Sequence, residues 1–161
     1  MAYHYLQAIA ADVHTIIELQ DEMKQRYAAA HQLMEKSEQF MNKEKQAAWF
    51  LTRWYYLRRA SSYLDQTKQA QNAFADSQNE LACGILFATK RLSLTKSLIL
   101  LSPDNPDEIS KALSFLEDRL DKYNQLIADA ELFDQSLIEQ MRQQIDQMTL
   151  EDVQKDLGGE N

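Results

Sequence analysis

Glycine and proline, the residues that most often end a helix or open a turn, are scarce in this chain. Its 161 residues include three glycines and two prolines, and both prolines fall within residues 102–108. Few turn-forming residues mean few turns, and long uninterrupted elements are typically helices. The sequence has no Asn-Gly or Asp-Gly hairpin signal and no strict alternation of apolar and polar residues. It therefore predicts an all-α protein.

The N-terminal part carries a seam of apolar residues spaced three and four apart, which is typical of a coiled-coil-like helix. This seam predicts one helix over residues 3–38. A turn is predicted at 39–46, with a second helix starting near Lys43. The seam consists of Leu6, Ile9, Val13, Ile16, Gln20, Met23, Tyr27, Ala30 and Met34.

The second helix is apolar nearly all round between residues 47 and 57, which is usual for a helix in the centre of a bundle. Its predicted inward face is Phe50, Leu57, Ala60 and Leu64, with Trp49 and Trp54 beside it. The polar stretch 76–79 leaves two alternatives. We favour a turn there, since unbroken helices of nearly 60 residues are rare, over one very long helix.

The C-terminal third contains the clearest helix boundaries. Within residues 102–108, Asn105 fits an N-cap, Pro106 the first helical position, and Glu108 a capping box. Asp134 fits a further N-cap, and Thr149 with Asp152 forms a second capping box before a short last helix that ends near Leu157. The helix predicted after this break has its own apolar seam, which consists of Ile109, Leu113, Leu116, Leu120, Tyr123 and Ile127.

These elements predict an antiparallel helical bundle of about four to five helices with long coiled-coil-like seams. Residues 1–157 are expected to form a single domain, and residues 158–161 a disordered tail. Seams of this length often exceed what one small bundle covers, so self-association, as a homodimer, is also expected.

The net charge of −8 is unevenly distributed. Residues 43–101 carry 9 basic and 4 acidic side chains, a net +5, whereas residues 102–161 carry 5 basic and 15 acidic side chains, a net −10. The two regions either face each other inside the bundle or meet partners of opposite charge. With no signal peptide, no membrane-spanning run and one cysteine, the chain is expected to be cytoplasmic.

Catalytic and cofactor motifs are absent from the sequence. His14 and Glu18, with Asp21 or Glu22, share a helix face that suits either a weak metal site or an ordinary ion pair. The single thiol, Cys83, is expected to be a small buried apolar residue. We therefore expect no metal, no cofactor and no enzymatic activity.

One candidate binding patch lies on the second helix, where aromatic and basic residues alternate. Projection at 100° per residue places Leu51, Tyr55, Arg58, Arg59 and Ser62 on the face opposite the predicted core. Tyr and Arg are enriched at binding hot spots, so this patch is predicted to contact a partner. Alternatively, another helix of the bundle covers it.

The same projection turns the neighbouring Arg53 inward, where a buried charge needs a carboxylate partner, a cleft or an oligomer seam.

The function favoured by these features is a non-enzymatic protein–protein interaction module, such as an adaptor, chaperone-like binder or regulatory subunit. Its partner is another protein or a second copy of itself. One alternative is a nucleic-acid-associated regulator, which the acidic net charge disfavours. The other is a helical-bundle enzyme or ligand carrier with a pocket between helices. A membrane partner is not expected.

Overall fold

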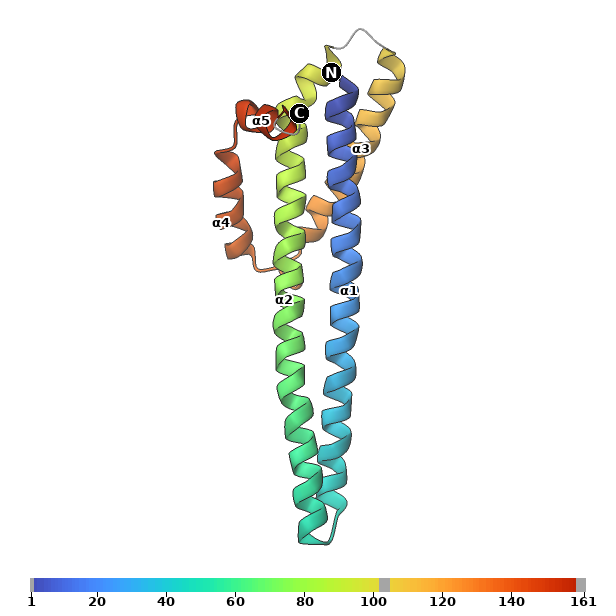
Figure 1. The fold of residues 1–161 in the computed structure, drawn as a ribbon, viewed down its shortest axis with the longest axis vertical. Helices are drawn as coiled ribbons and strands as arrows, with labels where there is room; N and C mark the ends of the chain where they lie inside the picture. Colours follow the sequence, from blue (N-terminus) through green and yellow to red (C-terminus); the bar gives the residue numbers. More distant parts are fainter. Residues whose placement is uncertain (1, 102–104, 159–161) are drawn as a thin grey trace. The chain divides into compact units, whose positions relative to one another are not determined.

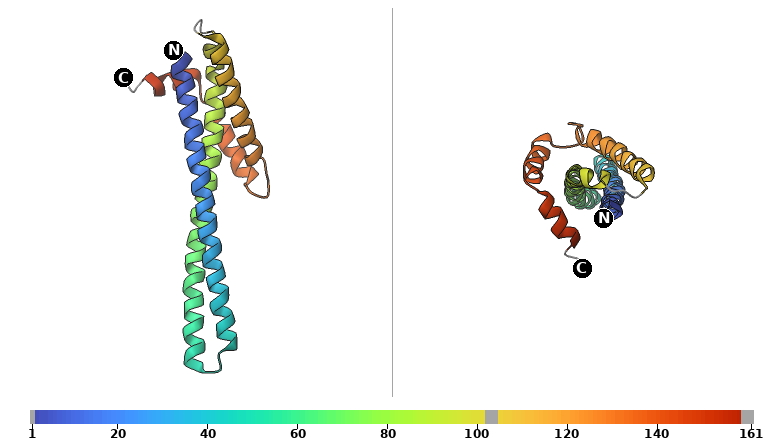
Figure 2. Two further views of the ribbon diagram at one scale, coloured as in Figure 1. Left: turned by 90° about the vertical axis from the view of Figure 1, so that its right-hand side faces the viewer. Right: turned by 90° about the horizontal axis from the view of Figure 1, so that it is seen from above.

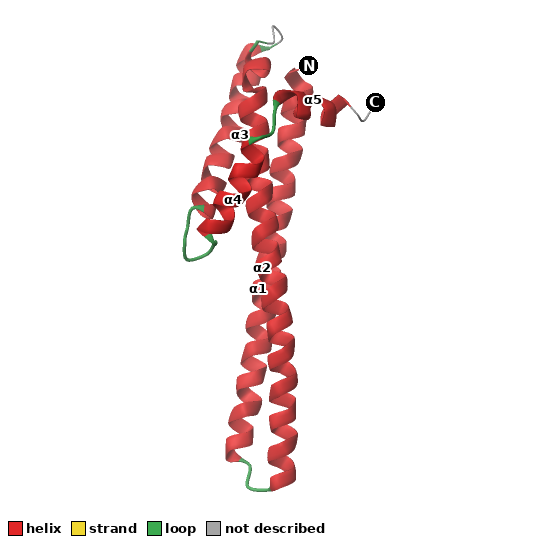
Figure 3. Cartoon of the chain, turned by 90° about the vertical axis from the view of Figure 1, so that its left-hand side faces the viewer, coloured by secondary structure: helices red, strands yellow, loops and turns green. Residues whose placement is uncertain are grey.

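The computed structural model describes residues 2–101 and 105–158, and every secondary-structure element within them is a helix (Figures 1 and 3). The chain is an antiparallel helical bundle, which confirms the all-α prediction. The five helices are α1 (Ala2–Gln46), α2 (Phe50–Leu100), α3 (Pro106–Ile127), α4 (Gln135–Asp146) and α5 (Leu150–Gly158).

The helices form two compact units. The first combines Met1–Glu18 with Glu80–Asn161, and the second consists of Leu19–Asn79. Both α1 and α2 contribute to each unit. The second unit is a helical hairpin, in which residues 19–46 and 50–79 run side by side in opposite directions (Figures 1 and 2). The one-domain prediction is not tested by this division.

Large aliphatic side chains fill the core of the first unit, because three long helical segments surround it. The start of α1 and α3 each supply a buried seam, as the spacing predicted, and the end of α2 supplies another. Polar contacts also join α2 to α3, where Asn124 donates to Thr89 over 2.9 Å and Lys96 lies 2.6 Å from Glu117. The buried apolar residues include Leu6, Ile9, Val13, Ile16, Leu81, Ile85, Leu92, Ile99, Ile109, Leu113, Leu116, Leu120 and Ile127.

Two of the predicted helix caps are confirmed. The Asp134 carboxylate accepts from the N–H groups of Ser136 and Leu137, which α4 itself leaves unpaired. Thr149 and Asp152 bond reciprocally at the start of α5, where each side chain accepts a hydrogen bond from the other's backbone N–H. The bond from the Thr149 N–H holds the pKa of Asp152 below its usual value.

The predicted capping box at α3 does not form. Asn105 precedes the helix as expected, but its backbone is left-handed, with φ 44°, and its side chain makes no capping bond. Its amide donates instead to the Tyr3 hydroxyl over 3.2 Å. Residues 102–104 of the predicted break, and 159–161 of the predicted tail, lie outside the described residues.

The predicted turn at 39–46 is wrong, because α1 continues to Gln46 and residues 47–49 make the connection to α2. The predicted turn at 76–79 is also wrong, since α2 is continuous from Phe50 to Leu100. Ser77 is buried in this stretch, and its hydroxyl donates to the Ala73 carbonyl over 3.2 Å. A polar residue satisfied in this way fits a helix interior, so the polar stretch does not break the helix.

The seam between the hairpin helices also differs from the predicted one. On α1 it keeps the predicted Ala30 and adds Ser37, both buried, while the half-buried Arg26 and Leu33 take the places of the predicted Tyr27 and Met34. The predicted seam residues Tyr27 and Met34 are 60% and 39% exposed.

The predicted inward face of α2 is wrong for the same reason. Of the four residues assigned to it, Ala60 is buried, whereas Phe50, Leu57 and Leu64 are 74%, 52% and 40% exposed. The segment 47–57 is therefore not central to a bundle, and Trp49 and Trp54 are also exposed.

Small side chains fill the seam that the hairpin uses instead. The fully buried residues described within 19–79 are Ala30, Ser37, Ala60, Thr67 and Ser77. Each buried hydroxyl is satisfied locally or across the seam; Ser37, for example, donates to the Ala60 carbonyl over 3.1 Å. Small residues at a helix contact let the two backbones approach closely, and this leaves the larger flanking side chains outside.

The close approach at Ala60 can be tested by overpacking. Replacing Ala60 with Leu is expected to destabilise the protein by about 1–3 kcal/mol, since the added atoms have no space opposite Ser37. Urea unfolding followed by circular dichroism measures the change. Ala75→Leu is the control, since Ala75 is exposed on the same helix. Equal stabilities for the two variants would contradict a closely packed seam.

Candidate functional site

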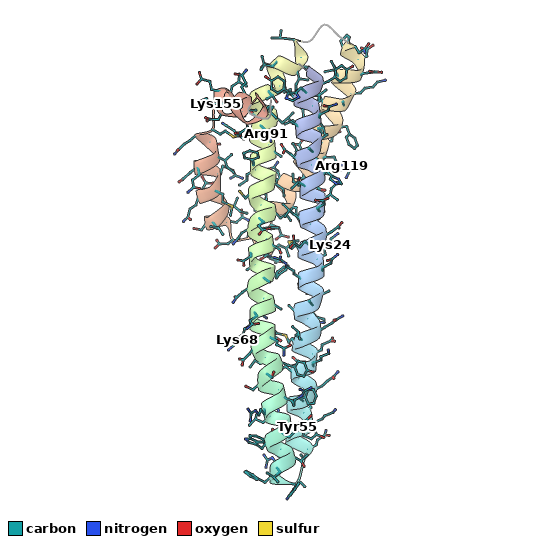
Figure 4. All side chains as sticks on the ribbon, in the orientation of Figure 1. Lys24, Tyr55, Lys68, Arg91, Arg119 and Lys155 are labelled. Carbon is teal, nitrogen blue, oxygen red and sulfur yellow. The ribbon has the colours of Figure 1, made fainter. Side chains whose placement is uncertain are left out.

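The predicted binding patch is exposed in the structure. Leu51, Tyr55, Arg58, Arg59 and Ser62 all lie on α2 near its start, and all are exposed. Tyr55, which is 52% exposed, lies nearer the connection between α1 and α2 than Lys68 of the same helix (Figure 4). We call these five residues the hairpin-end patch.

Both arginines of the patch lie over aromatic rings. The Arg58 guanidinium is 5.2 Å from the centroid of the Trp54 ring. The Arg59 guanidinium is 5.7 Å from the Phe40 ring and 5.4 Å from the Tyr63 ring. Within the described hairpin neither arginine pairs with a carboxylate. The rings thus orient two guanidinium groups whose charges are available to an anionic group.

The prediction that Arg53 faces inward is wrong. Its side chain is 55% exposed, and its guanidinium lies 3.3 Å from the Glu44 carboxylate of α1. A carboxylate partner from another helix, one of the predicted alternatives, is present, but the predicted burial is not. The error differs from that of Phe50 and Leu57, because Arg53 lies seven residues before the buried Ala60 but close to the connection, where α1 ends at Gln46.

The end of the hairpin combines positive charge with exposed apolar surface. Residues 43–59 carry five basic side chains and one acidic side chain, a net charge of +4. Both tryptophans of the chain, Trp49 and Trp54, are exposed in this segment. Sequence reasoning placed them against the core because it assumed that more helices surround this segment.

A second group of charges joins α1 to α2 in the first unit. Arg91 lies 3.1 Å from Asp12, and their side chains are 11% and 20% exposed. Burial raises the pKa of Asp12 above its usual value of 3.8, although the Arg91 charge acts in the opposite direction. The pair lies between two core seams and binds two helices together, which is a structural role.

The remaining candidates for chemistry give no site. Cys83 is exposed on α2 rather than buried, since its neighbours Leu81, Ala82 and Ile85 take the core-facing positions. His14 and Glu18 form an exposed pair 3.1 Å apart. No group of three or more metal-binding side chains occurs in the parts of the chain that the structure describes.

An apolar groove of about 460 Å³ runs between the start of α1 and α3. It is lined mainly by apolar residues, among them Tyr3, Leu6, Ile109 and Phe115, with Glu108 and Gln7 at its polar positions. It has no convergent set of catalytic groups. Nothing in its lining selects one class of ligand.

Comparisons with protein-family models, curated proteins and solved structures found no match to this chain. Over residues 2–101 and 105–158, no helix has a stretch long and apolar enough to cross a membrane. Among the described residues, the hairpin presents the most unusual surface, with exposed aromatic side chains beside basic ones.

The buried pair gives a prediction about pH. Because the folded state raises the pKa of Asp12, it holds that proton more tightly than the unfolded state does. The stability contributed by Asp12 is thus fully present below about pH 3.8 and is lost as the pH rises through the raised pKa. Asp12→Asn has no charge to lose, so its stability relative to the wild type should increase from acidic to neutral pH.

Urea midpoints of both proteins, measured at about pH 3.5 and about pH 7, give the stability of Asp12→Asn relative to the wild type at each pH. The effects of all other carboxylates cancel in this comparison. A difference that stays constant, or that falls with rising pH, would contradict the raised pKa.

Proposed function

We propose that this chain is a cytoplasmic protein–protein interaction module without catalytic activity of its own, and that its hairpin-end patch docks a protein partner. The observation that carries the proposal is the exposure of Leu51, Tyr55, Arg58 and Arg59 on one surface of α2. Exposed Tyr and Arg side chains next to apolar surface match the composition of binding hot spots.

The charge of this region indicates the chemistry of the partner. A net charge of +4 over residues 43–59 favours an acidic surface, and carboxylates suit the planar donors of Arg58 and Arg59. The exposed Leu51 and Tyr55 favour apolar side chains between those carboxylates. The proposed partner is therefore an acidic, amphipathic helical segment of another protein.

The rings beneath the arginines support this proposal. Trp54 and Tyr63 restrict the guanidinium groups of Arg58 and Arg59, so less conformational entropy is lost when a carboxylate binds. Glu44 already holds Arg53, which leaves two arginines of this segment without a carboxylate partner within the hairpin.

Affinity capture followed by titration tests the proposal. Wild-type protein is compared with Tyr55→Ala/Arg58→Glu/Arg59→Glu in nuclease-treated lysate of the source cells. The retained protein is then purified and titrated against both forms. We expect its affinity to fall at least ~100-fold in the variant, because each hot-spot arginine contributes about 2 kcal/mol or more.

A matched control is Lys68→Glu/Gln69→Glu/Gln72→Glu, which changes the net charge by the same −4 on exposed positions farther along α2. It should bind the partner like the wild type. Equal affinities for the patch variant and the wild type, or failure to retain any protein, would contradict the proposal. Protein retained from untreated lysate but not from nuclease-treated lysate would identify nucleic acid as the ligand instead.

A further inference from the structure

A second surface of the hairpin is an open apolar stripe. It consists of Tyr27, Met34 and Met41 of α1 and Phe50, Leu57 and Leu64 of α2, each 39–74% exposed. On each helix the residues recur every seven positions, so each row stays on one face of its helix, with a drift of ~20° per heptad. We call these six residues the apolar stripe.

The two rows lie on the same side of the hairpin. Toward its open end, Tyr27 and Met34 line one depression with Gln71 and Phe74, and Gln71 continues the row of Leu57 and Leu64. At the connection, Glu44 and Ala48 line another depression with Phe50, Trp54 and Leu57. The stripe residues on each helix directly follow one row of half-buried seam residues, as Met34 follows Leu33 and Leu64 follows Tyr63. In an antiparallel helix pair, these positions of the two helices lie on the same side of the pair, which agrees with these contacts.

The residues of the stripe also meet in layers along the hairpin. Ser37 lies opposite Ala60, and the Tyr27 and Phe74 rings are 5.5 Å apart, so the pairing of the helices is fixed along the seam. This pairing places Met41 at the level of Leu57, and Met34 at the level of Leu64. Each of these two layers therefore presents one apolar side chain from each helix.

The opposite side of the hairpin is already closed by its own side chains. Phe40 and Tyr63 stack there at 5.5 Å. Lys36 lies 5.8 Å from the Tyr63 ring, and Lys43 lies 5.1 Å from the Phe40 ring. Cations thus cover these rings, and this side presents charge rather than open apolar surface. The two sides of the hairpin thus differ, and the stripe is the side left open.

The hairpin also lacks an apolar core of its own. Every fully buried residue described within 19–79 is Ala, Ser or Thr, while its large apolar side chains remain partly or largely exposed. The hydrophobic effect favours burial of such surface, and soluble proteins seldom leave so large an apolar patch uncovered.

We infer that the apolar stripe is the interface between two copies of this chain, whose hairpins pack face to face as a four-helix bundle. The stripe contains no charged residue, so identical copies do not repel each other there. Its layers supply two side chains from each copy, which is the arrangement of a four-helix core. A two-fold axis needs such a self-complementary patch.

The size of the stripe fits a dimer. Six large side chains that are each about half exposed provide on the order of 600 Å² of apolar surface. A standard protein interface buries ~800 Å² on each partner, so the stripe and its rim are sufficient. This inference does not depend on the proposed function, because Tyr55, Arg58 and Arg59 lie outside the stripe.

Sedimentation equilibrium tests the inference. The wild type should have twice the monomer mass of 18.7 kDa, and Met34→Lys/Leu64→Lys should shift it to a single chain. Gln32→Lys/Gln66→Lys adds the same charge to the same helices at exposed positions outside the stripe, and it should remain dimeric. A monomeric wild type, or equal masses for the two variants, would overturn the inference.

A crosslinking experiment covers the case in which the lysine variant loses its helical structure. Leu64→Cys and Gln66→Cys are made in a Cys83→Ser background and treated with a short bismaleimide. Leu64 lies near the middle of the hairpin, so two copies bring it together whether their ends point the same way or opposite ways. We expect a covalent dimer with Leu64→Cys and none with Gln66→Cys; equal crosslinking would overturn the inference.

Discussion

The close antiparallel contact of α1 and α2 is the constraint on which the hairpin and its surfaces depend. Alanine, serine and threonine occupy the buried positions of this contact, and Ser37 reaches the backbone of Ala60 across it. Small side chains at these positions bring the two backbones together, so the larger side chains beside them are only partly covered. The aromatic and aliphatic residues of these helices are therefore displaced to their outer faces, where they form the surfaces available for binding.

The first unit shows what the same heptad-like spacing produces when a third helix is present. There α3 covers the seams of α1 and α2, so Ile9, Ile85 and Leu120 are fully buried. The Asp12–Arg91 pair is excluded from most solvent by the same packing. Both units follow one pattern of apolar spacing. They differ in the number of helices that surround it, and this number decides whether a stripe becomes core or surface.

The hairpin thus offers two surfaces of different chemistry. The hairpin-end patch combines arginines held over aromatic rings with exposed leucine and tyrosine, which suits an acidic partner. The apolar stripe carries no charge, which suits a copy of itself. Separate surfaces allow one chain to dimerise and to bind a partner at the same time, and a dimer would present two equivalent patches. Such an arrangement increases the apparent affinity for a partner with repeated sites.

The sequence by itself determined the helical class and where α4 and α5 begin, because caps such as Asp134 and Thr149 act within a few residues. It also predicted which residues of the hairpin-end patch are exposed. Tertiary structure decided which row of residues forms the seam of the hairpin. Two rows that differ by one position have the same spacing along the chain but lie about 100° apart around the helix, so spacing alone does not choose between them. The rows that contain Arg26 on α1 and Ser77 on α2 became the seam, because Arg26 donates hydrogen bonds to the Ser77 hydroxyl and the Ala73 carbonyl of the facing helix. A partner so distant in sequence leaves no trace in local periodicity, and for this reason the more apolar row was predicted to be buried.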